Sequence, residues 1–321
     1  MGYGSYRASD WEKLKSSLNL HSKMKVEEVF LRNKIETAPA RTPAPDLAQI
    51  QYVSHDKPVE KKKANPKFDP KFIQTRECFD SAEHPSTTPI VVGLDVTASM
   101  GYLAVEVGTR ALNDLILKLY STEAVQDPSL MCAAYGDYND GAPLQVTQFE
   151  SDIRIAEQLL DLYFENGGQC EAVPTALWYY LARHTEIDAY NKRNEKGFVF
   201  TIGDDAPVRA GFVDKMVSNA IGDDGTGITR EGILKEVEEK FHVFHILIGG
   251  DQDPGFLYGR KMVIAKPEIV CIPEIIISAI QLVKGKSQEE ILSQWDEMSR
   301  PVIAAAIRQL HLPDLGKPVV L

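Results

Sequence analysis

The chain has 321 residues, 44% of them hydrophobic, so it is long and apolar enough to form one large globular domain with extensions. Its formal net charge is -11, and residues 86–321 carry 34 acidic against 20 basic side chains. This acidic balance disfavours nucleic acid as a partner and favours cations or basic groups.

No apolar run approaches the length of a membrane span, and the first residues contain no apolar signal-peptide core. We therefore expect a cytoplasmic protein that does not bind a membrane. The cysteines are widely spaced and form no Cys-x-x-Cys pair, which predicts reduced thiols rather than a disulfide framework at Cys78, Cys132, Cys170 and Cys271.

Residues 1–85 are predicted to form an extended amino-terminal arm that is partly disordered. Residues 37–71 are rich in Pro, Ala and Lys, which is typical of a linker. Two tandem motifs in this stretch, Asn-Pro-Lys-Phe and Asp-Pro-Lys-Phe, end at Phe68 and Phe72. A docking peptide with these two rings as anchors is the alternative to a solvated tether.

Residues 90–94 are almost entirely apolar, which predicts a parallel strand that is covered on both faces. Leucines and an isoleucine at helical spacing follow at positions 112, 115, 116 and 119. Asp95, Thr97 and Ser99 therefore fall in the turn between strand and helix, where α/β folds bind ligands. Their oxygens suit a hard cation such as Mg²⁺ or Mn²⁺.

The same three residues also have a purely structural interpretation. Ser99 can cap the helix, Thr97 is β-branched and suits a strand, and Asp95 can close the strand as a turn former. The short motif alone does not separate the two interpretations.

Further along the chain, predicted strands alternate with predicted helices, which indicates an α/β fold with a mainly parallel sheet. We expect a hairpin between residues 130–135 and 144–149, buried strands over 197–203 and 241–250, and a last short strand over 268–272. Several of these strands end in acidic residues, so a parallel sheet gathers them at one rim: Asp95, Asp137, Asp204, Asp205, Asp251 and Asp253.

Residues 286–321 are predicted to form a helical extension at the carboxyl end. Ser287 and Glu290 have the spacing of a capping box, and Ile291, Trp295 and Met298 follow as the apolar side of a helix. We expect Pro301 to end or kink that helix.

Residues 93–101, together with residues 200–204, resemble the metal-ion-dependent adhesion site of the von Willebrand factor type A (vWA) family. In that family an Asp-x-Ser/Thr-x-Ser turn, a loop Thr and a later Asp hold one divalent cation. The resemblance assigns Asp95, Thr97 and Ser99 to the turn and Asp204 to the later Asp. It covers roughly residues 88–285, and it implies a doubly wound, Rossmann-like domain over residues 86–285 with helices on both faces.

The family's loop Thr has no evident counterpart. Where the family often has Gly-Gly-Thr, this chain has Gly-Gly followed by Gln169, and Glu171 lies two positions later. We keep Gln169 and Glu171 as further candidate ligands, together with Asp137. Asp204 is followed by Asp205, Ala206 and Pro207, whereas the family usually has Gly after this Asp.

The resemblance implies a non-catalytic module that uses Mg²⁺ or Mn²⁺ to bind an acidic group of a partner protein, with an AAA+ ATPase among the expected partners. The alternative is a haloacid dehalogenase-like phosphohydrolase with Asp95 as the nucleophile. That chemistry needs a second acid two residues later to transfer a proton. Thr97 stands there, and a hydroxyl is a poor acid at neutral pH, which favours the binding module.

Overall fold

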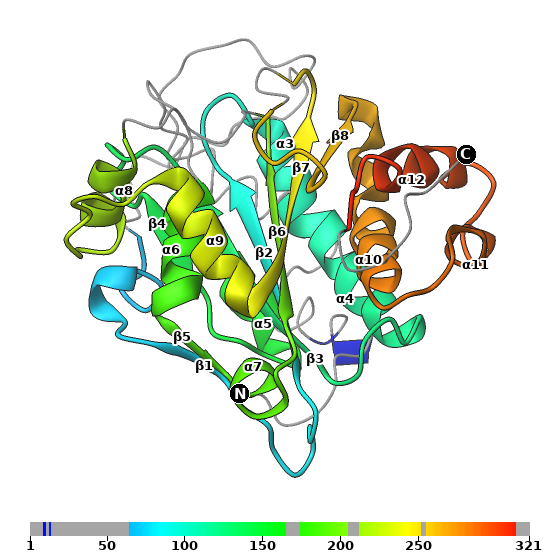
Figure 1. Ribbon diagram of the computed structural model, residues 1–321, viewed down its shortest axis with the longest axis horizontal. Coiled ribbons are helices and arrows are strands. Elements are labelled where there is room, and N and C mark those ends of the chain that lie inside the picture. The colour runs from blue at the N-terminus through cyan, green and yellow to red at the C-terminus, as the bar shows by residue number, and fades with distance from the viewer. Residues whose placement is uncertain are drawn as a thin grey trace.

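The computed structural model describes residues 9–10, 13, 64–164, 174–204, 212–251 and 255–312. A six-stranded sheet forms its centre, in the order β4-β3-β2-β6-β7-β8 (Figure 1). Every neighbouring pair is parallel except β3 and β4. The predicted α/β fold with a mainly parallel sheet is confirmed. The strands are β2 (Thr88–Asp95), β3 (Pro128–Tyr135), β4 (Leu144–Val146), β6 (Gly197–Gly203), β7 (Phe241–Ile248) and β8 (Lys261–Ile264).

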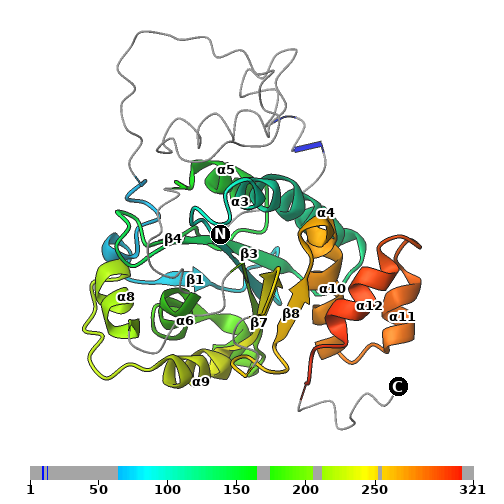
Figure 2. The same ribbon diagram turned by 90° about the horizontal axis from the view of Figure 1, so that it is seen from above.

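Helices cover both faces of this sheet (Figures 1 and 2). One layer contains α3 (Tyr102–Glu106), the π-helical turn η2 (Val107–Ala111), α4 (Leu112–Ser121), α5 (Arg154–Asp161) and α10 (Ile272–Val283). The opposite layer contains α6 (Pro174–Arg183), α8 (Val213–Ala220) and α9 (Arg230–Lys240). The remaining helices are η1 (Pro70–Phe72), α7 (Asp188–Arg193), η3 (Lys266–Cys271), α11 (Gln288–Ser293) and α12 (Arg300–Ile307).

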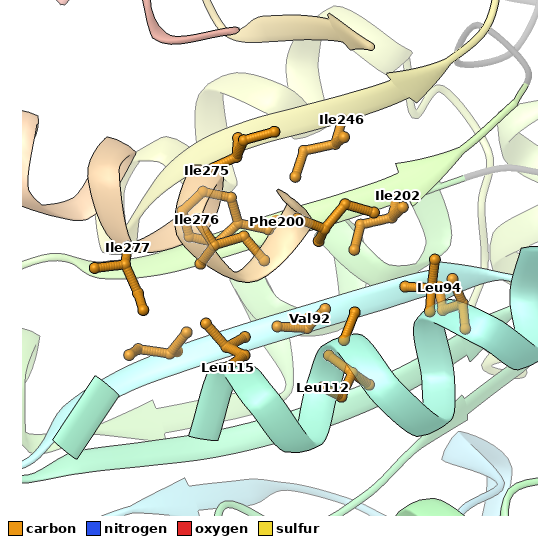
Figure 3. Packing of buried hydrophobic residues seen from close by; sticks show 14 of the residues in the cluster. Val92, Leu94, Leu112, Leu115, Phe200, Ile202, Ile246, Ile275, Ile276 and Ile277 are labelled. Carbon is orange, nitrogen blue, oxygen red and sulfur yellow. The ribbon is translucent and has the colours of Figure 1, made fainter. Parts of the chain in front are cut away.

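The apolar side chains of β2 point alternately into two hydrophobic clusters. Val92 and Leu94 pack in the cluster that α4 and α10 complete, as Figure 3 shows. Val91 belongs to the cluster on the α6 side of the sheet. This double burial explains why residues 90–94 lack polar alternation, since each fully buried large apolar side chain contributes roughly 1.5 to 3 kcal/mol.

The predicted hairpin is confirmed, because β4 pairs antiparallel with β3 and Leu144 lies opposite Tyr135. The predicted strand over residues 268–272 is wrong. That stretch belongs largely to η3, and the last strand is β8, which the sequence did not predict. Pro267 lies at the start of η3 and has no amide to donate to a strand. Glu268 caps the same turn, because its Oε2 accepts from the Ala265 amide at 2.7 Å.

At the carboxyl end, Ser287 and Glu290 form the predicted capping box and α11 begins at Gln288. Helix α11 ends at Ser293, however, and Pro301 lies in the first turn of α12 instead of ending or kinking a helix. Proline is tolerated there because first-turn amides have no partner within the helix. Met298, which was expected on the same helix as Ile291, follows the end of α11 and is 89% exposed.

Residues 64–85 lie against the sheet domain. The predicted boundaries of the three segments, residues 1–85, 86–285 and 286–321, stay predictions. Strand β1 (Arg76–Cys78) pairs in parallel with β5 (Thr185–Ile187) as a separate two-stranded sheet. Phe68 is 4% exposed, and its carbonyl accepts from the Val146 amide at 2.8 Å. Phe68 is therefore a domain residue and not part of a solvated tether. Apart from residues 9, 10 and 13, the first 63 residues lie outside the described part of the chain.

Within the described residues, Cys78, Cys132 and Cys271 are free and buried, and Cys170 lies outside them. Burial raises the pKa of the Cys78 thiol to about 11 and that of Cys132 to about 12. None of the helices described is both long and apolar enough to cross a lipid bilayer.

The tandem motifs provide a matched test of how the arm packs. We expect Phe68→Ala to lower the free energy of unfolding by about 3 to 5 kcal/mol, because it leaves a cavity in the core. Phe72 is 73% exposed, so we expect Phe72→Ala to change the free energy of unfolding by no more than about 0.5 kcal/mol. Urea denaturation followed by tryptophan fluorescence measures both values. Equal losses in the two variants would contradict the burial of Phe68.

Candidate functional site

The centre of the sheet holds the point where the strand order reverses. From β2 the chain continues outward through β3 to β4, and it then returns to β6 on the other side of β2 and continues outward to β8. The helices after β2 pack on one face of the sheet, and those after β6 pack on the other. At such a point the carboxyl ends of two neighbouring strands face a space between the diverging connections, where α/β folds bind ligands. Asp95 ends β2, and Asp204 follows β6.

Four of the predicted site residues are joined there by a chain of oxygen contacts. The Thr97 amide and hydroxyl both donate to Asp95 Oδ1, at 2.8 and 2.6 Å. Thr97 Oγ1 lies 3.1 Å from Ser99 Oγ. Ser99 Oγ donates to Asp204 Oδ1 at 2.9 Å, which links residues 105 positions apart in the sequence. The structure thus brings together Asp95, Thr97, Ser99 and Asp204.

This oxygen chain runs from the interior to the surface. Asp95 is 1% exposed and Thr97 is 4% exposed, whereas Ser99 is exposed and Asp204 is half-buried. An approaching ligand therefore meets Ser99 and Asp204 first.

The oxygen chain contains one contact more than its hydroxyl protons can bridge. Each hydroxyl donates one proton, and an ionised carboxylate only accepts. Thr97 and Ser99 therefore supply two protons for three oxygen-to-oxygen contacts of 2.6, 3.1 and 2.9 Å. If both protons go to the carboxylates, the two hydroxyl oxygens face each other with lone pairs only. A cation between the oxygens would accept these lone pairs.

Two residues that sequence analysis missed shape the site from β3 and β6. A Cβ at Gly203 would lie 2.9 Å from Asp95 Oδ2, so only glycine leaves room for this carboxylate. The Tyr135 hydroxyl donates to the Ile202 carbonyl at 3.0 Å, and the Tyr135 carbonyl accepts from the Val96 amide at 3.0 Å. Tyr135 therefore ties β3 to the ends of β2, beside it, and of β6, one strand further along the sheet. Gly203 lies in the segment 200–204 that carries the family resemblance, but its close approach to Asp95 was not predicted from the sequence.

The remaining candidate residues have other surroundings. Asp137 is buried after β3, and its Oδ1 accepts from the Asn139 amide at 3.1 Å, which shapes its loop. Asp251 Oδ1 accepts from Lys261 Nζ at 2.7 Å, so the ammonium group of Lys261 neutralises this carboxylate at the end of a strand. Four candidates lie outside the described residues and stay predictions: Gln169, Glu171, Asp205 and Asp253.

Among the described residues, no cluster of three or more His, Cys, Asp or Glu side chains could hold a metal ion. Any cation at the candidate site would depend on the two hydroxyls as much as on the two carboxylates. This donor set is all oxygen, which suits Mg²⁺ and Mn²⁺ better than softer metals.

No family model and no curated protein matches this chain. Two solved structures of the pilus adhesin SpaC from Lactobacillus rhamnosus GG are similar to it. The open conformation has a TM-score of 0.37 at 10% identity, over 71% of this chain and 31% of the adhesin. A second form has a TM-score of 0.36 at 11% identity, over 56% of this chain and 27% of the adhesin. The match thus spans less than a third of either adhesin chain.

Among the hydrogen-bond donors of the site, we expect the loss of the Thr97 hydroxyl to destabilise the protein most. Thr97→Val keeps the shape of the side chain but leaves the buried Asp95 carboxylate one hydrogen bond short, so we expect a loss of about 1.5 to 3 kcal/mol in the free energy of unfolding. Thr97→Ser keeps the hydroxyl and should lose less than about 1 kcal/mol. Chemical denaturation in the presence of EDTA measures both variants. A stability of Thr97→Val equal to that of Thr97→Ser would show that the hydrogen bond to Asp95 contributes nothing.

Proposed function

We propose that the protein is a metal-dependent binding module of the vWA kind, in which Asp95, Thr97, Ser99 and Asp204 hold Mg²⁺ or Mn²⁺. The cation in turn binds an acidic side chain of a partner protein. The observation that carries this proposal is the convergence of four oxygen-bearing side chains at the carboxyl ends of β2 and β6. A divalent cation accepts the lone pairs of both hydroxyls, while each hydroxyl keeps its proton and donates it in a hydrogen bond to a carboxylate.

The spacing of the oxygens supports this proposal. Around an octahedral Mg²⁺ with bonds of about 2.1 Å, neighbouring ligand atoms lie about 3 Å apart. The contact between Thr97 Oγ1 and Ser99 Oγ is 3.1 Å, and that between Ser99 Oγ and Asp204 Oδ1 is 2.9 Å. These oxygens therefore need little movement to become neighbouring ligands of one ion.

The charges also fit an anionic partner. Two carboxylates balance a divalent cation, and the hydroxyls are neutral, so the occupied site carries no surplus negative charge to repel an incoming acid. When bound, the metal supplies electrostatic attraction for an anionic oxygen. Asp95 anchors the site from the buried side, and Ser99 and Asp204 leave the solvent side open.

The proposal includes the finer architecture, namely a doubly wound vWA domain. The reversal of strand order at β2 and β6 and the helices on both faces support it. The cytoplasmic location and an AAA+ ATPase as a partner stay expectations.

The phosphohydrolase alternative has less support from these contacts. A nucleophilic Asp95 needs an accessible oxygen, yet the side chain is 1% exposed and its Oδ1 already accepts two hydrogen bonds from Thr97. Its Oδ2 faces the backbone of Gly203. Thr97 also donates its proton to Asp95, which leaves it unsuited to protonate a leaving group.

Metal titration tests the proposal directly. By isothermal titration calorimetry with MgCl₂ and MnCl₂, we expect the wild type to bind one ion. Ser99→Ala should weaken binding at least about tenfold, and Asp95→Ala should abolish it. Ser99 is exposed, so its variant should remain folded if Asp95→Ala does not.

Asp224→Ala is the matched control, because it removes one exposed carboxylate whose Oδ1 accepts from the Thr226 amide at 2.9 Å, outside the candidate site. Its metal affinity should equal that of the wild type. Affinity capture with and without EDTA then tests whether partner binding needs the ion. Unchanged metal affinity in Ser99→Ala would overturn the metal site. Turnover of p-nitrophenyl phosphate that Asp95→Asn abolishes would favour the phosphohydrolase instead.

A further inference from the structure

Strand β7 is longer than its outer neighbour, and half of its edge is open. Residues Phe241 to Leu247 pair with β6 along one side. On the other side, β8 pairs only with His245 to Ile248. The amino half of β7, residues 241–244, therefore has no strand beside it on this edge within the described part of the protein.

The backbone at Val243 points toward this open edge. The His245 amide donates to the Arg260 carbonyl at 3.0 Å, so the backbone groups of His245 face the β8 side. Alternate residues of a strand direct their amide and carbonyl groups to the same edge, so those of Val243 face this side too. No described residue forms a hydrogen bond with either group on this edge. Unpaired strand edges are templates for another strand. Val243 is only 3% exposed, so a strand that pairs here must reach the edge through the cavity beside it.

A cavity of about 460 Å³ lies next to this edge. Val243 lines it, together with Phe198 and Phe244 from the amino ends of β6 and β7. The rings of Phe198 and His242 stack with their centroids 5.3 Å apart and give it an aromatic wall. Its volume falls in the range of ligand-binding pockets. The cavity lies at the opposite end of β6 from Asp204, away from the candidate metal site.

The lining of the cavity has an excess of positive charge. Arg260 forms an ion pair with Glu238, with Nη2 and Oε2 3.0 Å apart, and Glu195 pairs with Arg193 at 3.2 Å. Lys196 and Lys284 also line the cavity, and neither pairs with an acidic side chain among the described residues. In a chain of net charge -11, these two lysines provide a local attraction for acids.

We propose that this cavity binds an extended acidic segment of a partner protein. The segment adds as a short strand to the open edge of β7, where Val243 supplies an amide and a carbonyl. Acidic side chains of the segment contact Lys196 and Lys284, and its apolar side chains lie against the ring of His242, which stacks on the buried ring of Phe198. This binding needs no metal, so it does not rest on the function proposed above.

The probe is a fluorescein-labelled heptapeptide of alternating Asp and Val, titrated with the full chain and followed by fluorescence anisotropy. We expect binding in the presence of EDTA. A Lys and Val peptide of the same length should not bind, because Lys196 and Lys284 repel it. An Asp and Val peptide with N-methylated amides should not bind either, because it cannot pair with a strand.

Charge reversal locates the binding. The double variant Lys196→Glu and Lys284→Glu should bind the Asp and Val peptide about tenfold or more weakly than the wild type, because two attractions become repulsions. Lys286→Glu makes the same kind of change at an exposed lysine that does not line the cavity, and should leave the affinity within about twofold.

The proposal fails if the acidic peptide does not bind, or if it binds the double variant as well as the wild type. Equal binding of the N-methylated peptide would overturn strand addition and leave only a site for anions. Binding that EDTA abolishes would assign the peptide to the metal site at the other end of the strands.

Discussion

The complete burial of β2 is the constraint on which the rest of the architecture depends. All eight of its residues are buried, with β3 on one side and β6 on the other. A strand in this position satisfies its backbone groups through both neighbours and covers its side chains with helices on both faces. Polar side chains with a chemical role are therefore confined to its end. The same holds for β6, which is why Asp95 and Asp204 meet at one rim.

Because the inner part of this rim is buried, its carboxylates need hydrogen-bond donors. A buried carboxylate such as Asp95 has a high free-energy cost unless donors surround it, and the Thr97 amide and hydroxyl supply them. Ser99 does the same for Asp204, and the two hydroxyls thereby use up their protons. The close approach of these oxygens at two strand ends is the geometry that the proposed cation site requires.

Local signals predicted the parts of the molecule that depend on local chemistry. The apolar runs identified β2, β6 and β7, and the spacing of Asp95, Thr97 and Ser99 identified the turn. Tertiary context decided the rest. Phe68 and Phe72 end similar motifs, yet Phe68 is buried beside β4 and Phe72 is exposed. Gly203 and Tyr135 belong to the site because neighbouring strands bring them beside Asp95, which no spacing within one segment shows. Strand β8 was missed because it is only four residues long.

The short β8 also explains the open edge of β7. Lys261 can begin this strand only after the chain turns at Gly259, whose φ of +76° suits glycine, and Pro267 starts a helix soon after it. Proteins protect exposed edges with short strands, charges or covering segments, since an open edge invites pairing. Here the edge lies in a cavity bordered by Val283 and Leu312 instead of facing open solvent. An edge enclosed in this way leaves no room for a broad sheet but has room for a single strand, which is the geometry that the proposed acidic segment requires.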